Sequence, residues 1–310
     1  MKVLLSKISA FPQLANALPE FGASDVPTQG SRTFFNSEHS LGTKWSGSHE
    51  FYVLLKYVEP NGNKSDPIPW SIRQQLFYQS FDASCMMENC VTIRPSQSFR
   101  RKIIDQFMET SGVSCHWTNL PMVLVGSLNA HWSAYARFLE EEIWKVDKSI
   151  GFTDPFSETL GEANFRTLSE TKQYYDLLVR AQHALNSNIR VLQLLLKESI
   201  KRFSQERETS GEQFFAHYTI LEGVTNDVIE ESYGLVAYFD SLKVRLCRTT
   251  EAIRDSITLR STYHAAVESQ NMKRLTQKSV QEARTVKAIA LVTLVYLPAT
   301  FVAASIARIP

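Results

Sequence analysis

The stretch AIALVTLVYLPATFVAASI, residues 288–306, runs for 19 residues without a charged side chain. At about 1.5 Å per residue a helix of this length is roughly 28 Å long, close to the hydrocarbon thickness of a bilayer. The alternative is a buried core helix, although such helices usually keep a polar residue on their solvent side. Pro298 is compatible with a membrane helix, where neighbouring groups satisfy the freed carbonyl. We therefore predict a transmembrane helix.

Basic residues flank this segment unequally, because five precede it closely and only Arg308 follows it. Lys and Arg are enriched on the cytoplasmic side of membrane helices. We expect a single-pass protein whose first 287 residues are cytosolic, in a membrane that the sequence does not specify. The five preceding residues are Lys273, Arg274, Lys278, Arg284 and Lys287.

Composition separates the rest of the chain from this segment. The chain has 310 residues, of which 44% are hydrophobic and 21% charged, as in a folded soluble protein. A net charge of +1 gives no indication of nucleic-acid binding. The four cysteines are too scattered for a disulfide framework or a zinc site. We expect no cofactor and no enzymatic activity, since no glycine-rich phosphate loop and no G-x-S-x-G motif occurs, and any metal site in the head cannot be assigned.

The N-terminal half predicts an α+β fold. Prolines and glycines make residues 1–45 an irregular arm, in which SRTFF (31–35) is expected to dock on the globular domain rather than bind a ligand. Residues 46–150 form the predicted head, with a small antiparallel meander of strands over 51–60, 72–82 and 90–96. Helical periodicity follows over 99–108 and from 119 to about 146. Glu140–Glu142 point in different directions on a helix, so they indicate a solvated face rather than a metal site.

Residues 151–287 are predicted to form a long helical hairpin and a coiled-coil-like stalk. One helix covers about 163–206, and a second runs from about 212 through the membrane segment, interrupted only by Pro298. A heptad seam along the second helix implies a partner helix, so we expect a homo-oligomer formed through the stalk and the membrane helix. Near the membrane the seam becomes polar, as a bundle around a wet axis would allow. The apolar seam residues are Leu221, Val228, Leu235, Leu242, Leu246 and Ile253.

The segment VTLVYLPATFVAA (292–304) resembles the first membrane helix of the CorA family of magnesium and divalent-cation channels. That family carries an aliphatic run followed by Pro, one residue, Thr-Phe, an aliphatic residue and Ala-Gly, and here Ala304 stands where Gly is usual. The upstream sequence is similar to the CorA-like proteins of filamentous fungi. The segments that carry this similarity are SRTFF (31–35), YVLLKYVEPNG (52–62), PWSIRQQLFYQSFD (69–82), IRPSQS (93–98) and NAHWSAYARFLEEEI (129–143).

The resemblance implies transmembrane transport of Mg²⁺ or a related divalent cation, carried as cargo. By position it places Leu297, Thr300 and Ala304 on the pore lining. The spacing is equally compatible with small residues that allow close helix contact. The family's Gly-Met-Asn motif would fall on residues 307–309, which are Ala-Arg-Ile, and no second membrane helix follows. The expectation is therefore a CorA-like chain truncated after its first membrane helix, incomplete or degenerate as a transporter.

A tail-anchored adaptor or scaffold is the alternative function. In that case the head and the coiled coil bind partners, and the last helix only anchors the chain without transport activity. Both interpretations place the head in the cytosol. They differ in whether the purified protein passes divalent cations.

Overall fold

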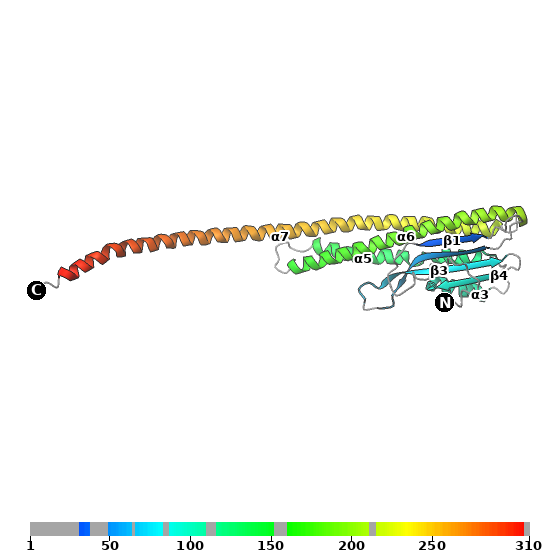
Figure 1. Ribbon diagram of the computed structural model, residues 1–310, viewed down its shortest axis with the longest axis horizontal. Coiled ribbons are helices and arrows are strands. Elements are labelled where there is room, and N and C mark those ends of the chain that lie inside the picture. The colour runs from blue at the N-terminus through cyan, green and yellow to red at the C-terminus, as the bar shows by residue number, and fades with distance from the viewer. Residues whose placement is uncertain are drawn as a thin grey trace. The chain divides into compact units, whose positions relative to one another are not determined.

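The computed structural model describes residues 31–37, 49–63, 66–82, 87–109, 116–151, 160–210 and 215–306 of the chain, which is α+β (Figure 1). The chain divides into two compact units, Met1–Gly151 with Thr167–Thr249, and Phe152–Arg166 with Thr250–Pro310. The elements in chain order are β1 (Arg32–Ser37), β2 (His49–Pro60), β3 (Trp70–Asp82), β4 (Met87–Ile93), α3 (Gln97–Glu109), α4 (Asn119–Ser127), α5 (Trp132–Gly151), α6 (Leu160–Ser210) and α7 (Phe215–Ile306).

The sheet is an antiparallel meander in the order β1-β2-β3-β4. The three predicted strands are confirmed as β2, β3 and β4. The sequence had placed residues 32–37 in an irregular arm, whereas they form the edge strand β1. Two aromatic pairs hold β1 on β2: the Phe34 and Tyr52 ring centroids are 6.2 Å apart, and those of Phe35 and Phe51 are 5.4 Å apart. Cross-strand aromatic pairs of this kind stabilise a register. The rest of the predicted arm lies outside the described residues.

Local sequence signals set where the sheet turns and where the first helix begins. Gly62 has φ of 78°, the left-handed conformation that a glycine adopts without a steric cost. Ser96 caps α3, because its Oγ accepts a hydrogen bond from the backbone N–H of Phe99 at 3.1 Å. Both features follow from the Asn61-Gly62 turn signal and from Ser96 directly ahead of an apolar periodic segment.

Both faces of the sheet carry buried side chains. On one face Phe51, Val53 and Phe77 join a cluster that includes Phe99 of α3 and Trp117. On the other face Leu54, Leu76 and Tyr78 form a second cluster within the sheet. Burial on both faces explains why neither face of β3 shows a clean alternation of apolar and polar residues.

The helices pack beside one another in the unit that contains the sheet, as Figure 1 shows for α5, α6 and the start of α7. Their shared core includes Trp132 and Leu139 of α5, Leu185 of α6, and Phe239 and Leu242 of α7. An ion pair between Arg245 Nη2 and Asp147 Oδ2 at 2.9 Å lies further along α5 and α7. These helices form one packed bundle rather than separate elements.

The single helix predicted from residue 119 to about 146 is wrong, because α4 ends at Ser127 and α5 begins at Trp132. The reason is Asn129, which is 7% exposed and lies in the intervening turn. Its Nδ2 donates to the carbonyl of Val228 at 3.2 Å and to Ser232 Oγ at 3.1 Å on α7. These bonds from the amide nitrogen hold the turn between α4 and α5 against α7.

Asn188 of α6 replaces a strand at the edge of β2. The β1 ladder ends where Arg32 pairs with Leu54, so the next outward-facing backbone groups of β2 belong to Lys56. Asn188 is fully buried. Its Oδ1 accepts from Lys56 N–H at 2.9 Å, and its Nδ2 donates to Lys56 O at 2.6 Å. The Ser31 hydroxyl also donates to Oδ1, at 2.7 Å. One amide thus anchors a helix to the sheet with the bonding pattern of a missing strand.

Replacing Asn188 with the similarly shaped leucine should destabilise the head. The N–H and C=O of Lys56 would lose their partners while staying buried, at a cost of about 3 kcal/mol in total. Thermal unfolding followed by far-UV circular dichroism measures the effect as a lowered midpoint. Asn186→Leu is the matched control, because Asn186 is exposed on the same helix. Equal midpoints for the two variants would contradict the role assigned to Asn188.

Candidate functional site

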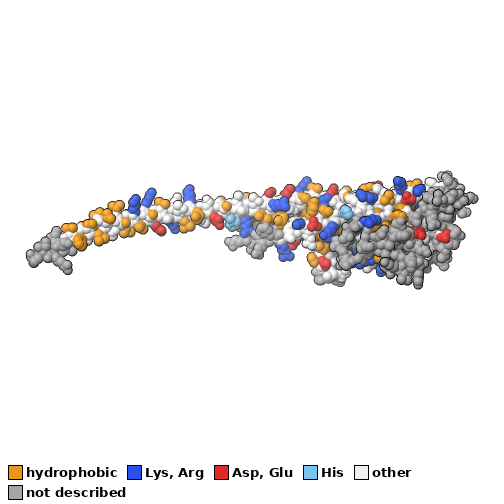
Figure 2. Space-filling view, in the orientation of Figure 1, with side chains coloured by type: hydrophobic (Ala, Val, Ile, Leu, Met, Phe, Trp, Pro, Cys, Tyr) orange, Lys and Arg blue, Asp and Glu red, His pale blue; other side chains and the backbone are white. Residues whose placement is uncertain are grey.

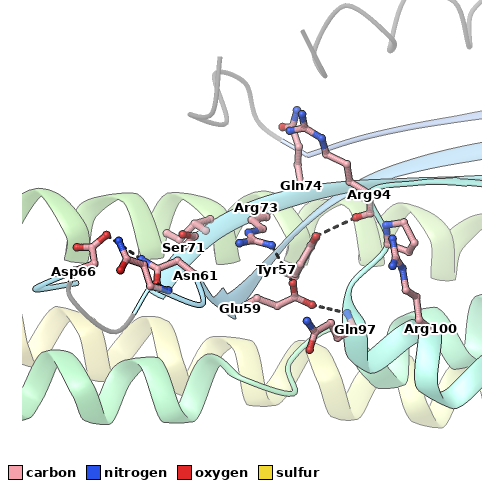
Figure 3. Close-up of a pocket in the computed structure, with 13 residues that line it drawn as sticks. Tyr57, Glu59, Asn61, Asp66, Ser71, Arg73, Gln74, Arg94, Gln97 and Arg100 are labelled. Carbon is pink, nitrogen blue, oxygen red and sulfur yellow. Dashed lines mark hydrogen bonds and ion pairs between the residues drawn. The ribbon is translucent and has the colours of Figure 1, made fainter. Parts of the chain in front are cut away.

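A pocket of about 690 Å³ lies where β3 continues beyond the end of β4 (Figure 3). The last pair between these strands is Leu76 with Ile93, so β3 extends past β4 to Trp70. Its walls are formed by residues of β2 and β3, by Asn61, Asn63 and Asp66 between these strands, by the connection from β4 to α3, and by α3 itself. The meander and the start of α3 therefore build the pocket together.

Glu59 is the buried charge of this pocket. Its side chain is 4% exposed, and Oε2 lies 3.4 Å from Nη1 of Arg73. Oε1 accepts a hydrogen bond from the backbone N–H of Gln97, the first residue of α3. A carboxylate at a helix N-terminus satisfies an N–H that has no partner within the helix, and it interacts favourably with the helix dipole. Glu59 thus joins β2 to α3, and this carboxylate is engaged in a structural contact.

Tyr57 holds the connection between β4 and α3. Its hydroxyl donates to the carbonyl of Arg94 at 3.0 Å. Burial, and then the charge of Glu59, raise the pKa of Tyr57 to about 12, so the hydroxyl remains a donor at neutral pH. Arg94 has φ of 50°, which is uncommon for a residue other than glycine. The Tyr57 contact therefore fixes a strained turn.

The second carboxylate of the pocket is engaged in the turn between β2 and β3. Asp66 Oδ2 accepts from Asn61 Nδ2 at 2.9 Å, and Oδ1 accepts from the backbone N–H of Ile68 at 2.9 Å. Arg94 and Arg100 add two exposed guanidinium groups. Figure 3 shows the Arg94 side chain directed away from Tyr57 and Glu59. The pocket is polar, and its two carboxylates are bound to protein groups rather than facing each other.

No group of three or more His, Cys, Asp or Glu side chains among the described residues could hold a metal ion. Within Glu140–Glu142, Glu142 Oε1 accepts from Lys145 Nζ at 2.5 Å, and Oε2 accepts from the hydroxyl of Tyr174 at 3.2 Å. Glu141 is exposed, whereas Glu140 and Glu142 are half-buried, so the predicted solvated face holds for Glu141 alone.

A second polar cluster lies at the other end of the sheet. Gln79 is fully buried, and its Nε2 donates to Glu88 Oε1 at 2.5 Å and to the carbonyl of Trp117 at 2.7 Å. Burial raises the pKa of Glu88 to about 7, although the hydrogen bond from Gln79 opposes the shift. Glu88 therefore changes charge near neutral pH.

The predicted membrane segment forms the last part of α7, which is the one described helix long and apolar enough to cross a bilayer. Its side chains are exposed through residue 303, with Leu297 at 67% and Phe301 at 76%. The Thr300 hydroxyl donates to the carbonyls of Tyr296 at 2.9 Å and Leu297 at 3.0 Å within the helix. A hydroxyl bonded in this way keeps its oxygen available as an acceptor.

The predicted pore-lining residues share one face of α7. At about 100° per residue, Leu297 and Thr300 lie within about 60° of each other, together with Thr293, Val286 and Glu282. The helix also includes Ala304, whose side chain lies outside the described residues. Both interpretations of these residues, as the lining of a pore and as small residues that allow close helix contact, place them on this face.

The predicted oligomer seam is buried inside the chain itself. Leu221 and Val228 belong to the cluster beneath the sheet. Leu235, Leu242 and Leu246 pack with α5 and α6. Ile253 is 1% exposed. A heptad period is the same whether a helix packs against its own chain or against another copy, so the spacing could not distinguish the two.

Sequence reasoning missed Asn188 and Glu59. Asn188 falls within a helical pattern and shows no signal of its own. Glu59 had one signal: it is the next-to-last residue of β2, and the residues before it, 51–58, are all buried. A charge at such a position requires a partner, but its partner, the backbone N–H of Gln97, is 38 residues away.

No protein-family model matches the chain. No curated protein matches it either. Among solved structures, the chain is similar to the full-length CmaX protein, with 12% identity and a TM-score of 0.49 over 94% of this chain and 73% of that one. It is similar to the CorA magnesium transporter of Methanocaldococcus jannaschii, with 13% identity and a TM-score of 0.46 over 89% and 69%. It is also similar to the cytoplasmic domain of ZntB from Vibrio parahaemolyticus, with 14% identity and a TM-score of 0.35 over 76% and 83%.

Glu59→Gln should lower the stability of the head by about 1–2 kcal/mol, because α3 loses a charge-assisted hydrogen bond at its N-terminus. Arg73→Gln is the comparison variant. It should cost less than about 1 kcal/mol, since Arg73 is 44% exposed and its contact is long. Thermal unfolding midpoints measure both. A larger loss of stability for Arg73→Gln than for Glu59→Gln would show that the ion pair with Arg73, rather than the hydrogen bond to α3, is the stabilising contact of Glu59.

The raised pKa of Glu88 predicts a pH-dependent stability. Between the unfolded value of 4.5 and the folded value of about 7, the folded state binds more protons, so this contribution is present below pH 4.5 and is lost as pH rises through about 7. Glu88→Gln should remove this dependence and add about 1 kcal/mol at pH 8, a value discounted for partial exposure. Unfolding midpoints at pH 5 and pH 8 measure the change. Glu222→Gln, at an exposed position on α7, controls for net charge; a flat wild-type profile would refute the assignment.

Proposed function

We propose that the chain is a subunit of a CorA-like transporter that carries Mg²⁺ or a related divalent cation through the membrane, passively and as an oligomer. In this proposal the membrane-spanning part of α7 lines the path with Leu297, Thr300 and Ala304. The head lies in the cytosol. The sequence pattern around Pro298, Thr300 and Phe301 supports this proposal, together with the distribution of charge on α7.

The charge distribution is the observation that carries the proposal. Glu282 lies on the same face as Thr300, about five turns earlier in the helix. Arg284 and Lys287 lie about 140–160° away from Glu282 and Thr300, and Lys287 lies about 80° from Leu297. A path along the Thr300 face would therefore meet a carboxylate before the hydroxyl ring and would avoid Arg284 and Lys287. Lys278 lies one turn before Glu282 and within about 40° of it, where the two side chains can pair across one helical turn. Rings of acidic side chains and hydroxyls are the chemistry that cation pathways use.

Ion flux through the reconstituted full chain tests the proposal. Vesicles that contain the purified protein and a Mg²⁺-sensitive fluorophore should report Mg²⁺ entry down an imposed gradient, above that of empty vesicles. Protease protection and light scattering would first establish insertion and oligomeric state. An inserted oligomer that passes no divalent cation would refute transport and leave a membrane-anchored helical scaffold.

Two cysteine variants test which face lines the path. A cationic, water-soluble thiol reagent should reduce flux through Leu297→Cys by about threefold or more, because the added charge would stand in the path. Leu291→Cys lies about 120° away from Leu297 on the same helix and should be affected much less. Wild-type protein treated with the same reagent controls for the four native cysteines. Equal inhibition of both variants would contradict the assigned face.

A further inference from the structure

The segment of α7 directly before the membrane helix has an unusual charge pattern. Between residues 268 and 287 it carries five basic side chains and two acidic ones. All of these side chains are exposed. None of the five basic residues forms an ion pair with any described residue. Figure 2 shows most of the Lys and Arg side chains of this part of the helix along its upper edge, and hydrophobic side chains with some charged ones along its lower edge.

Three of the basic residues share one face. At about 100° per residue, Lys273, Arg284 and Lys287 lie within about 60° of one another, opposite the face of Glu282 and Thr300. In an assembly with the Thr300 face toward its axis, these three cations would point outward. Close to the membrane, the outward direction is the direction of the lipid.

Distance along the helix divides the basic residues into two groups. At about 1.5 Å per residue from Ala288, Lys287 and Arg284 lie roughly 2 and 6 Å before the apolar segment. These distances fall within the headgroup layer, which is about 5–8 Å thick on each side. Lys278 lies roughly 15 Å away, and Lys273 and Arg274 roughly 21–23 Å away, which is about two Debye lengths or more at physiological ionic strength. Only the first group can contact headgroups directly.

We propose that Arg284 and Lys287 form a binding surface for the headgroups of anionic phospholipids. This inference rests on the membrane-spanning part of the proposed function and does not require transport. The phosphate of each lipid accepts hydrogen bonds from the guanidinium of Arg284 or the ammonium of Lys287. The additional negative charge of an anionic headgroup makes such a lipid favoured over a zwitterionic one.

A second copy of the chain fits this surface less well than lipid does. The two acidic residues of the segment, Glu268 and Glu282, lie on the opposite side of the helix from Arg284 and Lys287. In a parallel symmetric assembly, Arg284 and Lys287 could not meet these carboxylates without turning the basic face inward. Anionic lipid headgroups supply negative charge at the level of Arg284 and Lys287, and the basic face of the helix can then stay directed outward.

Lipid selectivity of the full chain in vesicles tests the proposal. Electron spin resonance would measure the fraction of spin-labelled phosphatidylserine or phosphatidylcholine that is immobilised at the protein, in vesicles of phosphatidylcholine with minor phosphatidylserine. Wild-type protein should favour phosphatidylserine by about threefold or more. The double variant Arg284→Gln with Lys287→Gln should reduce this ratio to about one. Arg284→Lys with Lys287→Arg should retain it.

Lys273→Gln with Arg274→Gln is the matched control, because it removes the same charge from the same helix about 20 Å from the membrane. It should leave the selectivity within about 1.5-fold of wild type, since this distance exceeds the Debye length. Equal loss in both double variants would overturn the proposal, because the effect would then come from net charge alone. An unchanged ratio in the Arg284 and Lys287 variant would overturn it directly.

Two further measurements identify the occupant. Inorganic phosphate, added at an ionic strength matched with chloride, should leave the lipid selectivity unchanged. A loss of the lipid selectivity in phosphate would reveal a site for the free anion instead. Light scattering should give the same oligomeric state for wild type and for the Arg284 and Lys287 variant. A smaller assembly would overturn the proposal in favour of contact between copies. Ion flux is not used as a readout, so its absence would affect only the transport proposal.

Discussion

The end of α7 imposes a constraint that the protein alone does not satisfy. Through residue 303 its apolar side chains are exposed, and each exposed CH₂ costs about 0.8 kcal/mol in water relative to an apolar environment. The backbone, by contrast, needs little from its surroundings, because the helix satisfies its own amides and the hydroxyls of Thr293 and Thr300 bond to carbonyls one turn earlier. A segment that satisfies its polar groups and exposes its apolar ones is suited to lipid. The same helix begins in the core beneath the sheet, so one part of α7 is buried in protein while the other exposes apolar side chains.

The distance over which each sequence signal acts explains which parts of the fold could be predicted from the sequence. The meander and the extent of α7 follow from local patterns, since strand composition, the Asn61-Gly62 turn and an unbroken helical period each act over a few residues. The break between α4 and α5 does not, because it depends on Asn129 reaching α7 about 100 residues later. Strand β1 was missed for a similar reason: its aromatic residues need β2 beside them. Periodicity identifies a helix, whereas only tertiary contacts show where it ends.

The pocket beside β3 was not predicted, because it depends on groups that are distant in sequence. Arg73 could have paired with a carboxylate or bound a ligand as far as the sequence shows, and the structure pairs it with Glu59. It could not show that the same carboxylate also meets the first N–H of α3. Glu59, Tyr57 and Asp66 are all engaged in holding turns and helix ends. These side chains therefore stabilise turns and a helix end rather than a ligand site.

The rotation of α7 about its own axis links the two proposals. If Arg284 and Lys287 faced the axis of an assembly, equivalent cations would stand near one another. Each pair 10 Å apart would repel by about 0.4 kcal/mol in water, and by about 1.7 kcal/mol at an effective dielectric constant of 20. The sum over a ring of subunits would oppose both assembly and the entry of a divalent cation. The opposite rotation places Glu282 and Thr300 inward and brings Arg284 and Lys287 to the lipid. The rotation of this one helix therefore sets both the charge along the proposed path and the charge presented to the membrane, and the second rotation takes Arg284 and Lys287 out of the path.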